Sequence, residues 1–180
     1  MGIMRKGLLA VVLSALWALA PDLSAQAAQR DKRAGPRERS VIDCHKARRN
    51  GTTCLACNIY FEARGEPISG QAKVAQVTLA RRDSKHYPKT LCAVVWQPRQ
   101  FSWTGDGRSD KVYDRDAWAR ALTLAGTMIS EHRRGPATKA GTSKSMTGVL
   151  WYHSKKVKPK WARTMRRHAT EGGHIFYRAR

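Results

Sequence analysis

Acidic residues are scarce in this chain of 180 residues, which has 13 Asp and Glu against 34 Lys and Arg. The formal net charge of +21 at pH 7 attracts polyanions, so nucleic acid, an anionic membrane and an anionic cell-wall polymer are candidate partners. The hydrophobic content of 42% is high enough for a packed core, which excludes a chain that is disordered throughout. The length favours one domain over two.

The apolar run near the N-terminus, residues 8–20, is too short for a comfortable transmembrane helix. A basic pair precedes it, a proline ends it, and a small-x-small cleavage site follows at residues 25–27. This order predicts a secretory signal peptide over residues 1–27, with an uncleaved signal anchor as the alternative. Export, to the periplasm or to the extracellular cell wall, weakens the nucleic-acid interpretation, and we expect no nucleic-acid partner.

Several motifs of well-known catalytic and metal sites are missing from the chain. It has no Gly-rich phosphate loop, no Ser nucleophile elbow and no His-x-x-x-His or matching carboxylate pattern. His153 and His174, in two expected short strands, are candidates for paired polar groups in a cleft or for a satisfied part of the core. We expect a monomer without a metal ion or other cofactor.

The chain has only four cysteines, Cys44, Cys54, Cys57 and Cys92. An even number in an exported protein predicts two disulfides, for which three pairings are possible. A zinc site that adds Cys44 and either Cys92 or His45 to the Cys54-x-x-Cys57 motif is one alternative. A redox Cys-x-x-Cys is another, although no βαβ pattern surrounds it. We favour structural disulfides.

The expected architecture is α+β: one compact, α-dominated domain with a small β element. Residues 28–51 are basic and predict a flexible arm tied down near Cys44, and the domain then covers residues 52–180. Strands are expected at 149–153 and 174–177, where aromatic and β-branched residues concentrate. The segments 97–110 and 135–148 are rich in turn-forming residues and predict loops.

Three helices are expected, each with its own boundary signals. The first runs over about 54–64 with Thr52 or Thr53 as its N-cap, and the second over 70–82 with Ser69 as its N-cap. The third starts after Asp114 or Asp116 and ends at Gly135-Pro136. Its apolar stripe of Trp118, Ala121, Leu122, Ala125, Met128 and Ile129 predicts a buried face.

Glu62 is unusual because, at 100° per residue, it shares one stripe of the first helix with Leu55 and Ile59. A carboxylate on an apolar face is costly unless it is neutralised or paired. Desolvation raises its pKa, which is the condition for a general acid, whereas a buried ion pair with Arg64 or another cation is the alternative. Glu66 lies past the helix end, either as a second cleft carboxylate or as a cap of the next helix or a partner of Arg64.

The segment from Asn58 to Pro67, NIYFEARGEP, closely resembles the SleB-type cell-wall hydrolases, the family of spore cortex-lytic enzymes and their relatives. Further motifs of that family follow in the same order up to about residue 178. They include VVWQ at 94–97, QFSW at 100–103, WYH at 151–153, PKWA at 159–162 and GHIFY at 173–177.

The resemblance implies a lysozyme-like domain that cleaves peptidoglycan glycan strands between N-acetylmuramic acid and N-acetylglucosamine. The family's catalytic acid is the first Glu of its Glu-Ala-Arg-Gly-Glu motif, here Glu62, and Glu66 would position water in a hydrolase. A lytic transglycosylase needs only one carboxyl group, and we favour that outcome. The residues expected to bind substrate are Tyr60, Gln97, Phe101, Ser102, Trp103, Tyr152, His153 and His174.

The resemblance also implies a Cys54–Cys92 disulfide, which leaves Cys44 to pair with Cys57. The Lys and Arg surface would hold the anionic cell-wall polymer and the carboxylates of its peptides. Two other functions stay open. One is a non-catalytic, cationic peptidoglycan-binding protein in which Glu62 is structural. The other is a cationic exported protein that targets membranes or nucleic acid.

Overall fold

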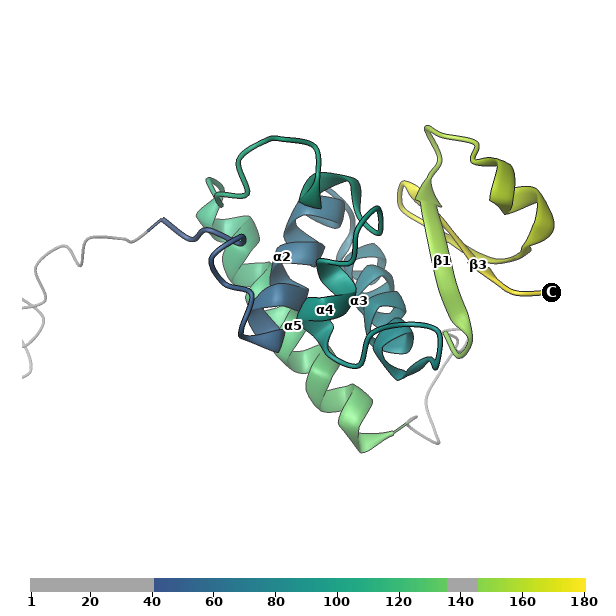
Figure 1. Cartoon of the computed structure of the whole chain (residues 1–180), viewed down its shortest axis with the longest axis horizontal. Coiled ribbons are helices and arrows are strands. Elements are labelled where there is room, and N and C mark those ends of the chain that lie inside the picture. Colours follow the sequence, from purple (N-terminus) through teal and green to yellow (C-terminus); the bar gives the residue numbers. More distant parts are fainter. Residues whose placement is uncertain (1–40, 136–145) are drawn as a thin grey trace, which may run out of the picture. The chain divides into compact units, whose positions relative to one another are not determined.

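The computed structural model describes residues 41–135 and 146–180. The expected signal peptide, most of the expected arm and most of the loop at 135–148 lie outside the described residues. The described part contains four α-helices, two short 3-10 helices and three strands (Figure 1). In chain order these are α2 (Gly51–Ala63), α3 (Ile68–Asp83), α4 (Leu91–Val95), η1 (Ser102–Thr104), α5 (Arg115–Arg134), β1 (Val149–Ser154), η2 (Lys160–Thr164), β2 (Arg166–Glu171) and β3 (His174–Arg178).

Helix α2 is the centre of the helical part, where it contacts α3, α4 and α5. Eight of its 13 residues are buried, so it has no wide solvent-exposed face. Its N-cap is Asn50, whose side chain accepts a hydrogen bond from the backbone N–H of Thr53. The expected cap at Thr52 or Thr53 is therefore wrong, because both threonines lie inside the first turn.

Of the other two long helices, one has the expected N-cap and the other does not. Asp114 caps α5 as expected, since its carboxylate accepts a hydrogen bond from the N–H of Ala117. Ser69 does not cap α3, which begins directly after Pro67 without a side-chain cap. The Ser69 hydroxyl instead donates to Glu171 at the end of β2. Leu122, which was placed in the buried stripe of α5, is 39% exposed, while Trp118 is buried.

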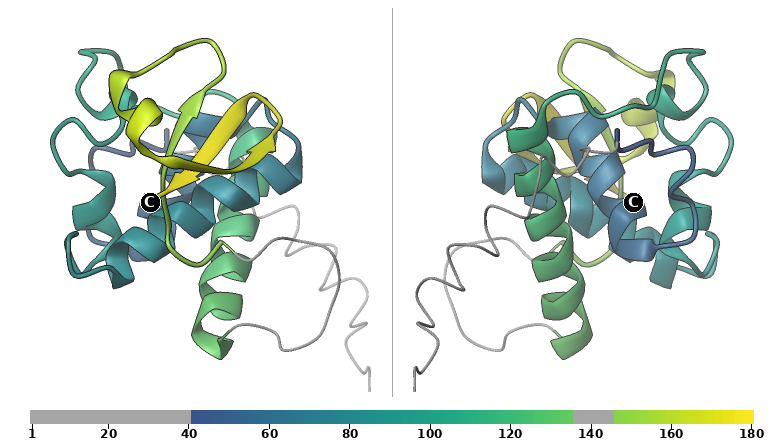
Figure 2. Two further views of the ribbon diagram at one scale, coloured as in Figure 1. Left: turned by 90° about the vertical axis from the view of Figure 1, so that its right-hand side faces the viewer. Right: turned by 90° about the vertical axis from the view of Figure 1, so that its left-hand side faces the viewer.

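The three strands form one antiparallel sheet in the order β1-β3-β2 (Figure 2). The expected strands at 149–153 and 174–177 correspond to β1 and β3. Strand β2 was not expected, because its sequence RRHATE has no alternation of apolar and polar residues. The sheet packs on α3 through β1 and β2. This arrangement confirms the expected α-dominated α+β architecture.

Two hydrophobic clusters stabilise the described part. The larger one lies among the four helices and includes Leu55, Ile59 and Trp118. The smaller one joins the helices to the sheet and includes Val74, Val77 and Phe176. Tyr152 packs against both clusters, so its ring lies at the junction of helices and sheet.

Both expected disulfides are present, Cys44–Cys57 and Cys54–Cys92. They leave no cysteine free for a zinc site or for redox cycling. Residues 41–50, which we assigned to the arm, belong to the same structured unit as the helices. The N–H of Cys44 donates to Asp110 and the N–H of Val112 donates to Ile42, at 3.0 and 2.9 Å. Within residues 41–135 and 146–180, no helix combines the length and apolarity of a membrane span.

Candidate active site

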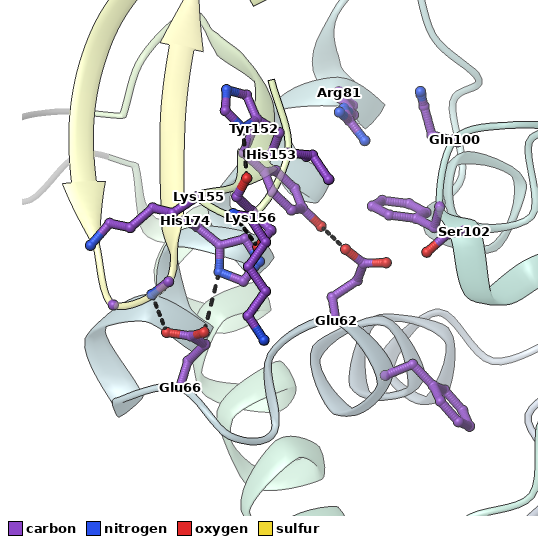
Figure 3. Close-up of a pocket in the computed structure, with 16 residues that line it drawn as sticks. Glu62, Glu66, Arg81, Gln100, Ser102, Tyr152, His153, Lys155, Lys156 and His174 are labelled. Atoms are coloured by element: carbon purple, nitrogen blue, oxygen red, sulfur yellow. Dashed lines mark hydrogen bonds and ion pairs between the residues drawn. The ribbon is translucent and has the colours of Figure 1, made fainter. Parts of the chain in front are cut away.

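A pocket of about 770 Å³ lies where the helical part meets the sheet (Figure 3). Its wall comes from the end of α2, the end of α3, the segment before η1, strand β1 with the turn that follows it, and the turn between β2 and β3. The lining residues are Phe61, Glu62, Glu66, Arg81, Gln100, Phe101, Ser102, Tyr152, His153, Ser154, Lys155, Lys156, Val157, Gly172, Gly173 and His174.

Glu62 lies in the last turn of α2, half-buried, with its carboxyl group in the pocket (Figure 3). The Tyr152 hydroxyl donates a hydrogen bond to Glu62 Oε2 at 3.0 Å. Burial raises the pKa of Glu62, and the Tyr152 hydrogen bond and the nearby Arg81 charge only partly oppose this. The expected direction of the pKa shift is therefore confirmed, and the carboxyl group is suited to donate a proton.

The alternative of a Glu62 ion pair is not observed. Among the described residues, no Lys, Arg or His nitrogen lies within 4.0 Å of the Glu62 carboxylate. The guanidinium of Arg64 lies instead over the ring of Tyr60, 4.8 Å from its centre. Glu62 thus has no direct ion-pair partner in the described part of the chain, and the charge of Arg81 acts on it only from a longer distance.

Tyr152 reaches Glu62 from β1, across the junction. Its ring packs against the rings of His174 and Phe176, with centroids 5.4 and 5.6 Å away. Burial, together with the neighbouring Glu62, raises the pKa of Tyr152 well above its usual value. The hydroxyl therefore stays protonated and acts as a hydrogen-bond donor to Glu62.

Arg81 is a pocket residue that the sequence analysis missed. Only 5% of it is exposed, its Nε donates to the carbonyl of Leu150 at 2.8 Å, and its guanidinium lies over the rings of Phe101 and Tyr152. In the sequence it looks like one of many surface cations. A signal was nevertheless present, because Arg81 continues the helical stripe of Val74 and Val77 on α3.

Glu66 lines the same pocket, but its carboxylate is already used by the protein. Glu66 Oε2 accepts a hydrogen bond from the backbone N–H of Gly173 at 2.6 Å, and Oε1 lies 3.8 Å from His174 Nδ1 (Figure 3). Burial lowers the pKa of His174, which favours its neutral form. Glu66 neither caps α3 nor pairs with Arg64. It fastens the β2–β3 turn to the end of α2.

His153 is held by two hydrogen bonds and by aromatic contacts. Its Nδ1 lies 2.8 Å from the carbonyl of Ser154, which can only accept, so Nδ1 carries the proton. The Tyr177 hydroxyl lies within hydrogen-bond distance of Nε2, at 2.9 Å. The imidazole also stacks on the ring of Tyr177 and meets the ring of Trp161 edge-on. This fixed ring forms part of the pocket wall.

Seven of the ten expected catalytic and substrate-binding residues line the pocket: Glu62, Glu66, Phe101, Ser102, Tyr152, His153 and His174. Tyr60, Gln97 and Trp103 do not line it, and substrate binding by these three residues stays a prediction. Tyr60 is buried, and its hydroxyl accepts hydrogen bonds from the N–H groups of Tyr113 and Asp114. Trp103 is buried too, donates from Nε1 to the Asn58 side chain and stacks on Phe61.

Comparison with known sequences identifies related proteins. A family model described as Cell Wall Hydrolase matches residues 65–177, more than half of the chain. The chain is 42% identical over 59 residues to a spore cortex-lytic enzyme of Oceanobacillus iheyensis, covering 33% of this chain and 21% of that protein. It is 39% identical over 103 residues to the spore cortex-lytic enzyme of Halalkalibacterium halodurans, covering 57% of this chain and 30% of that protein. The matches thus span less than a third of these relatives.

Solved structures show the same relationship at the level of the fold. The catalytic domain of the germination-specific lytic transglycosylase SleB from Bacillus anthracis superimposes with a TM-score of 0.55 at 27% identity. The match covers 72% of this chain and 95% of that domain. The catalytic domain of SleB from Bacillus cereus gives a TM-score of 0.50 at 28% identity, covering 71% and 90%. The expected lysozyme-like fold is confirmed by this likeness.

Proposed function

This chain belongs to the cell wall hydrolase family, and we propose that it cleaves peptidoglycan glycan strands as a lytic transglycosylase with Glu62 as the catalytic acid and base. The bond cleaved joins N-acetylmuramic acid to N-acetylglucosamine. The family match begins at Gly65, so support for the role of Glu62 comes from its geometry and from the NIYFEARGEP motif. The printed description of the B. anthracis relative as a lytic transglycosylase supports the reaction type.

In the proposed mechanism, protonated Glu62 donates its proton to the glycosidic oxygen as the bond to the muramyl C1 breaks. An oxocarbenium-like centre develops at that carbon. The muramyl 6-hydroxyl attacks C1 and gives its proton to the Glu62 carboxylate, which closes a 1,6-anhydro ring and restores the acid. The Tyr152 hydroxyl, 3.0 Å from Glu62 Oε2, stabilises the carboxylate formed midway.

The observation that carries this proposal is that, of the two carboxyl groups in the pocket wall, Glu62 is the one with a pKa raised by burial, while Glu66 is held by a backbone N–H. Glycosidases that use water pair two carboxyl groups, as acid with nucleophile or as acid with base. Glu62 and Glu66 are the acidic residues of the pocket wall, and Glu66 is bound to the Gly173 N–H. The Gly173 N–H fixes the position of Glu66 at the β2–β3 turn, whereas Glu62 is contacted by the Tyr152 hydroxyl. An internal hydroxyl as nucleophile needs no second carboxylate.

The proposed reaction also assigns roles to the other pocket residues and to the basic surface. Phe101, Ser102, Tyr152, His153 and His174 would contact the sugar chain in the pocket. The basic surface would hold the protein on the anionic cell-wall polymer, at the periplasmic or extracellular location that the expected signal peptide implies. We expect the protein to act as a monomer without a cofactor.

The decisive experiment compares wild type with Glu62→Gln on purified sacculi and analyses the soluble muropeptides by mass spectrometry. Wild type is expected to release fragments with anhydro-muramyl ends, and Glu62→Gln is expected to lose about 10²–10⁴-fold in rate, the usual contribution of a general acid. The glutamine can still accept the Tyr152 hydrogen bond, so the fold should be kept. Glu131→Gln, the same change at an exposed position of α5, is the matched control.

Other results would redirect the assignment. Reducing ends in place of anhydro ends, together with loss of activity in Glu66→Gln, would mean hydrolysis with Glu66 as the water-positioning group. Sedimentation with sacculi but no release of fragments by wild type would mean a cationic peptidoglycan-binding protein. Tight binding to nucleic acid or anionic lipid alone, lost at high salt, would mean that the target is not the cell wall.

A further inference from the structure

Two adjacent lysines, Lys155 and Lys156, lie at the mouth of the pocket and take no part in the proposed reaction. They belong to the turn that follows β1. The N–H of Val157 donates to the carbonyl of Ser154 at 3.1 Å, and the N–H of Lys156 donates to the Ser154 hydroxyl at 3.2 Å. This places both lysines at the centre of a hydrogen-bonded turn, with their side chains exposed.

Two hydrogen bonds in series connect this turn to the segment that follows Glu62. The N–H of Lys155 donates to the carbonyl of Gly173 at 2.8 Å, and the N–H of Gly173 donates to Glu66 at 2.6 Å. Glu66 follows α2, the helix that carries Glu62. The turn with the two lysines is therefore connected to the end of α2 through the turn between β2 and β3. In Figure 3 the Lys156 side chain extends to the pocket side of the sheet, and that of Lys155 extends away from Glu62.

The charges of both lysines are uncompensated within residues 41–135 and 146–180. No ion pair in that part of the chain involves either side chain. The carboxylate of Glu171 is paired with Lys73 at 3.0 Å, and that of Glu66 accepts a hydrogen bond from the neutral N–H of Gly173 at 2.6 Å. Among the residues of the pocket wall, Arg81, Lys155 and Lys156 outnumber the two acidic residues, Glu62 and Glu66. The pocket mouth thus carries an excess of positive charge that can attract an anion.

From this juxtaposition we infer that the turn with Lys155 and Lys156 forms a subsite for a carboxylate of the peptide stem that the muramic acid carries, with Lys156 on the pocket side and Lys155 at its outer edge. The inference rests on the proposed function, which supplies the substrate class. The sugar rings themselves are neutral, so the anionic groups of the strand that can meet the lysines are carboxylates. The subsite makes the protein prefer strands whose stems keep free carboxylates over strands whose stems are neutral.

The test measures binding rather than turnover. The Glu62→Gln protein is titrated by calorimetry with a soluble disaccharide-peptide, and with the same fragment after its peptide carboxylates have been converted to neutral amides. Lys155→Ala/Lys156→Ala is compared with Lys158→Ala/Lys160→Ala, which removes the same charge from residues outside the pocket wall. Thermal melts verify that both double variants are folded.

We expect the pocket variant to bind the carboxylated fragment about three- to ten-fold more weakly at low salt, as two exposed charge contacts would give. Its affinity for the amidated fragment should equal that of the Glu62→Gln parent, and the control variant should match the parent on both ligands. An equal loss in the control, or an equal loss on the amidated fragment, would overturn the subsite.

A third ligand separates two sources of the carboxylate. The peptide-free disaccharide keeps only its lactyl carboxylate, and lysine-dependent binding of that ligand as strong as that of the full fragment would overturn the assignment to the stem. Failure of the proposed reaction gives a different result. Wild type would then release no fragments from sacculi, while carboxylate-dependent binding through Lys155 and Lys156 would persist.

Discussion

The helical region, residues 41–135, and the sheet region, residues 146–180, are built in different ways. The helical region has 16 Lys and Arg against nine Asp and Glu, contains both disulfides and surrounds the larger hydrophobic cluster. The sheet region has nine Lys and Arg against a single Glu, and most of its strand residues are only partly buried. The helical region is therefore the cross-linked and more densely packed one, and the shorter sheet region has the higher density of positive charge.

The pocket draws on both regions, because seven of its 16 lining residues come from the helical region and nine from the sheet region. Glu62 comes from the helical region and Tyr152 from the sheet region, and one hydrogen bond joins them. Four further hydrogen bonds cross the junction: from Gly173 to Glu66, from Arg81 to Leu150, and from Ser69 and Lys73 to Glu171. The environment of Glu62 therefore depends on how the sheet docks on the helices. Substitutions can change the stability of the helical region and the docking of the sheet on the helices separately.

The largest expected effect is on the stability of the helical region. Replacing Cys54 and Cys92 by alanine is expected to lower the free energy of unfolding by about 4 kcal/mol, and replacing Cys44 and Cys57 by about 3 kcal/mol. The order follows from the sequence separations of 38 and 13, because the longer closed loop restricts the unfolded chain more. Urea unfolding measures both values, and the reverse order would contradict the prediction.

The second expected effect is on the docking of the sheet on the helices. Gly172 has a φ of +52°, and a Cβ there would lie 1.9 Å from Glu66 Oε2. Gly172→Ala is therefore expected to displace Glu66, to cost about 1–3 kcal/mol of stability and to reduce cleavage of sacculi as Tyr152 shifts. Urea unfolding and the muropeptide assay give the two values.

Two controls isolate the contact with Glu66. Gly107 has a φ of +73° with no atom within 4 Å of a Cβ, so Gly107→Ala tests the backbone cost alone, about 1 kcal/mol, and should keep activity. In a double-mutant cycle, Gly172→Ala should cost much less when Glu66 is already alanine. Strictly additive losses would mean that the glycine is needed only for its backbone conformation.

The smallest expected effect concerns the hydrogen bond between the two regions. Tyr152→Phe removes the donor that stabilises the Glu62 carboxylate, which raises the pKa of Glu62 further. Since Glu62 must be protonated to act as the acid, activity is lost as the pH rises through its pKa. The alkaline limb of the kcat/KM profile should therefore move to higher pH.

Tyr177→Phe is the matched control for this shift. It removes a hydroxyl of the same sheet, one that is hydrogen-bonded to His153 rather than to Glu62. Its alkaline limb should coincide with that of wild type. A shift of equal size in both variants would show that the limb reports the packing of the sheet and not the Tyr152–Glu62 hydrogen bond.

The residues that sequence reasoning located correctly are those whose signal is local. Glu62 follows from a helical period of 3.6 residues, and Asp114 from its position before an amphipathic helix. The location of other residues depends on which element covers them. Tyr60 and Trp103 are of the residue types that line sugar-binding grooves, but both are buried. Arg81 is of a residue type common on surfaces, but it is buried and lines the pocket.

The sequence by itself determined the carboxyl group placed among apolar residues, three of the four described α-helices, two of the three strands, and a resemblance that implied the disulfide pairs. Only the tertiary structure decided the role of Glu66, which contacts Gly173 across 107 residues of sequence, and the place of Lys155 and Lys156 beside the pocket. Periodicity determines which side chains share a face of one element. Which element packs against that face depends on the burial and hydrogen bonding of the whole domain, and no single segment contains that information.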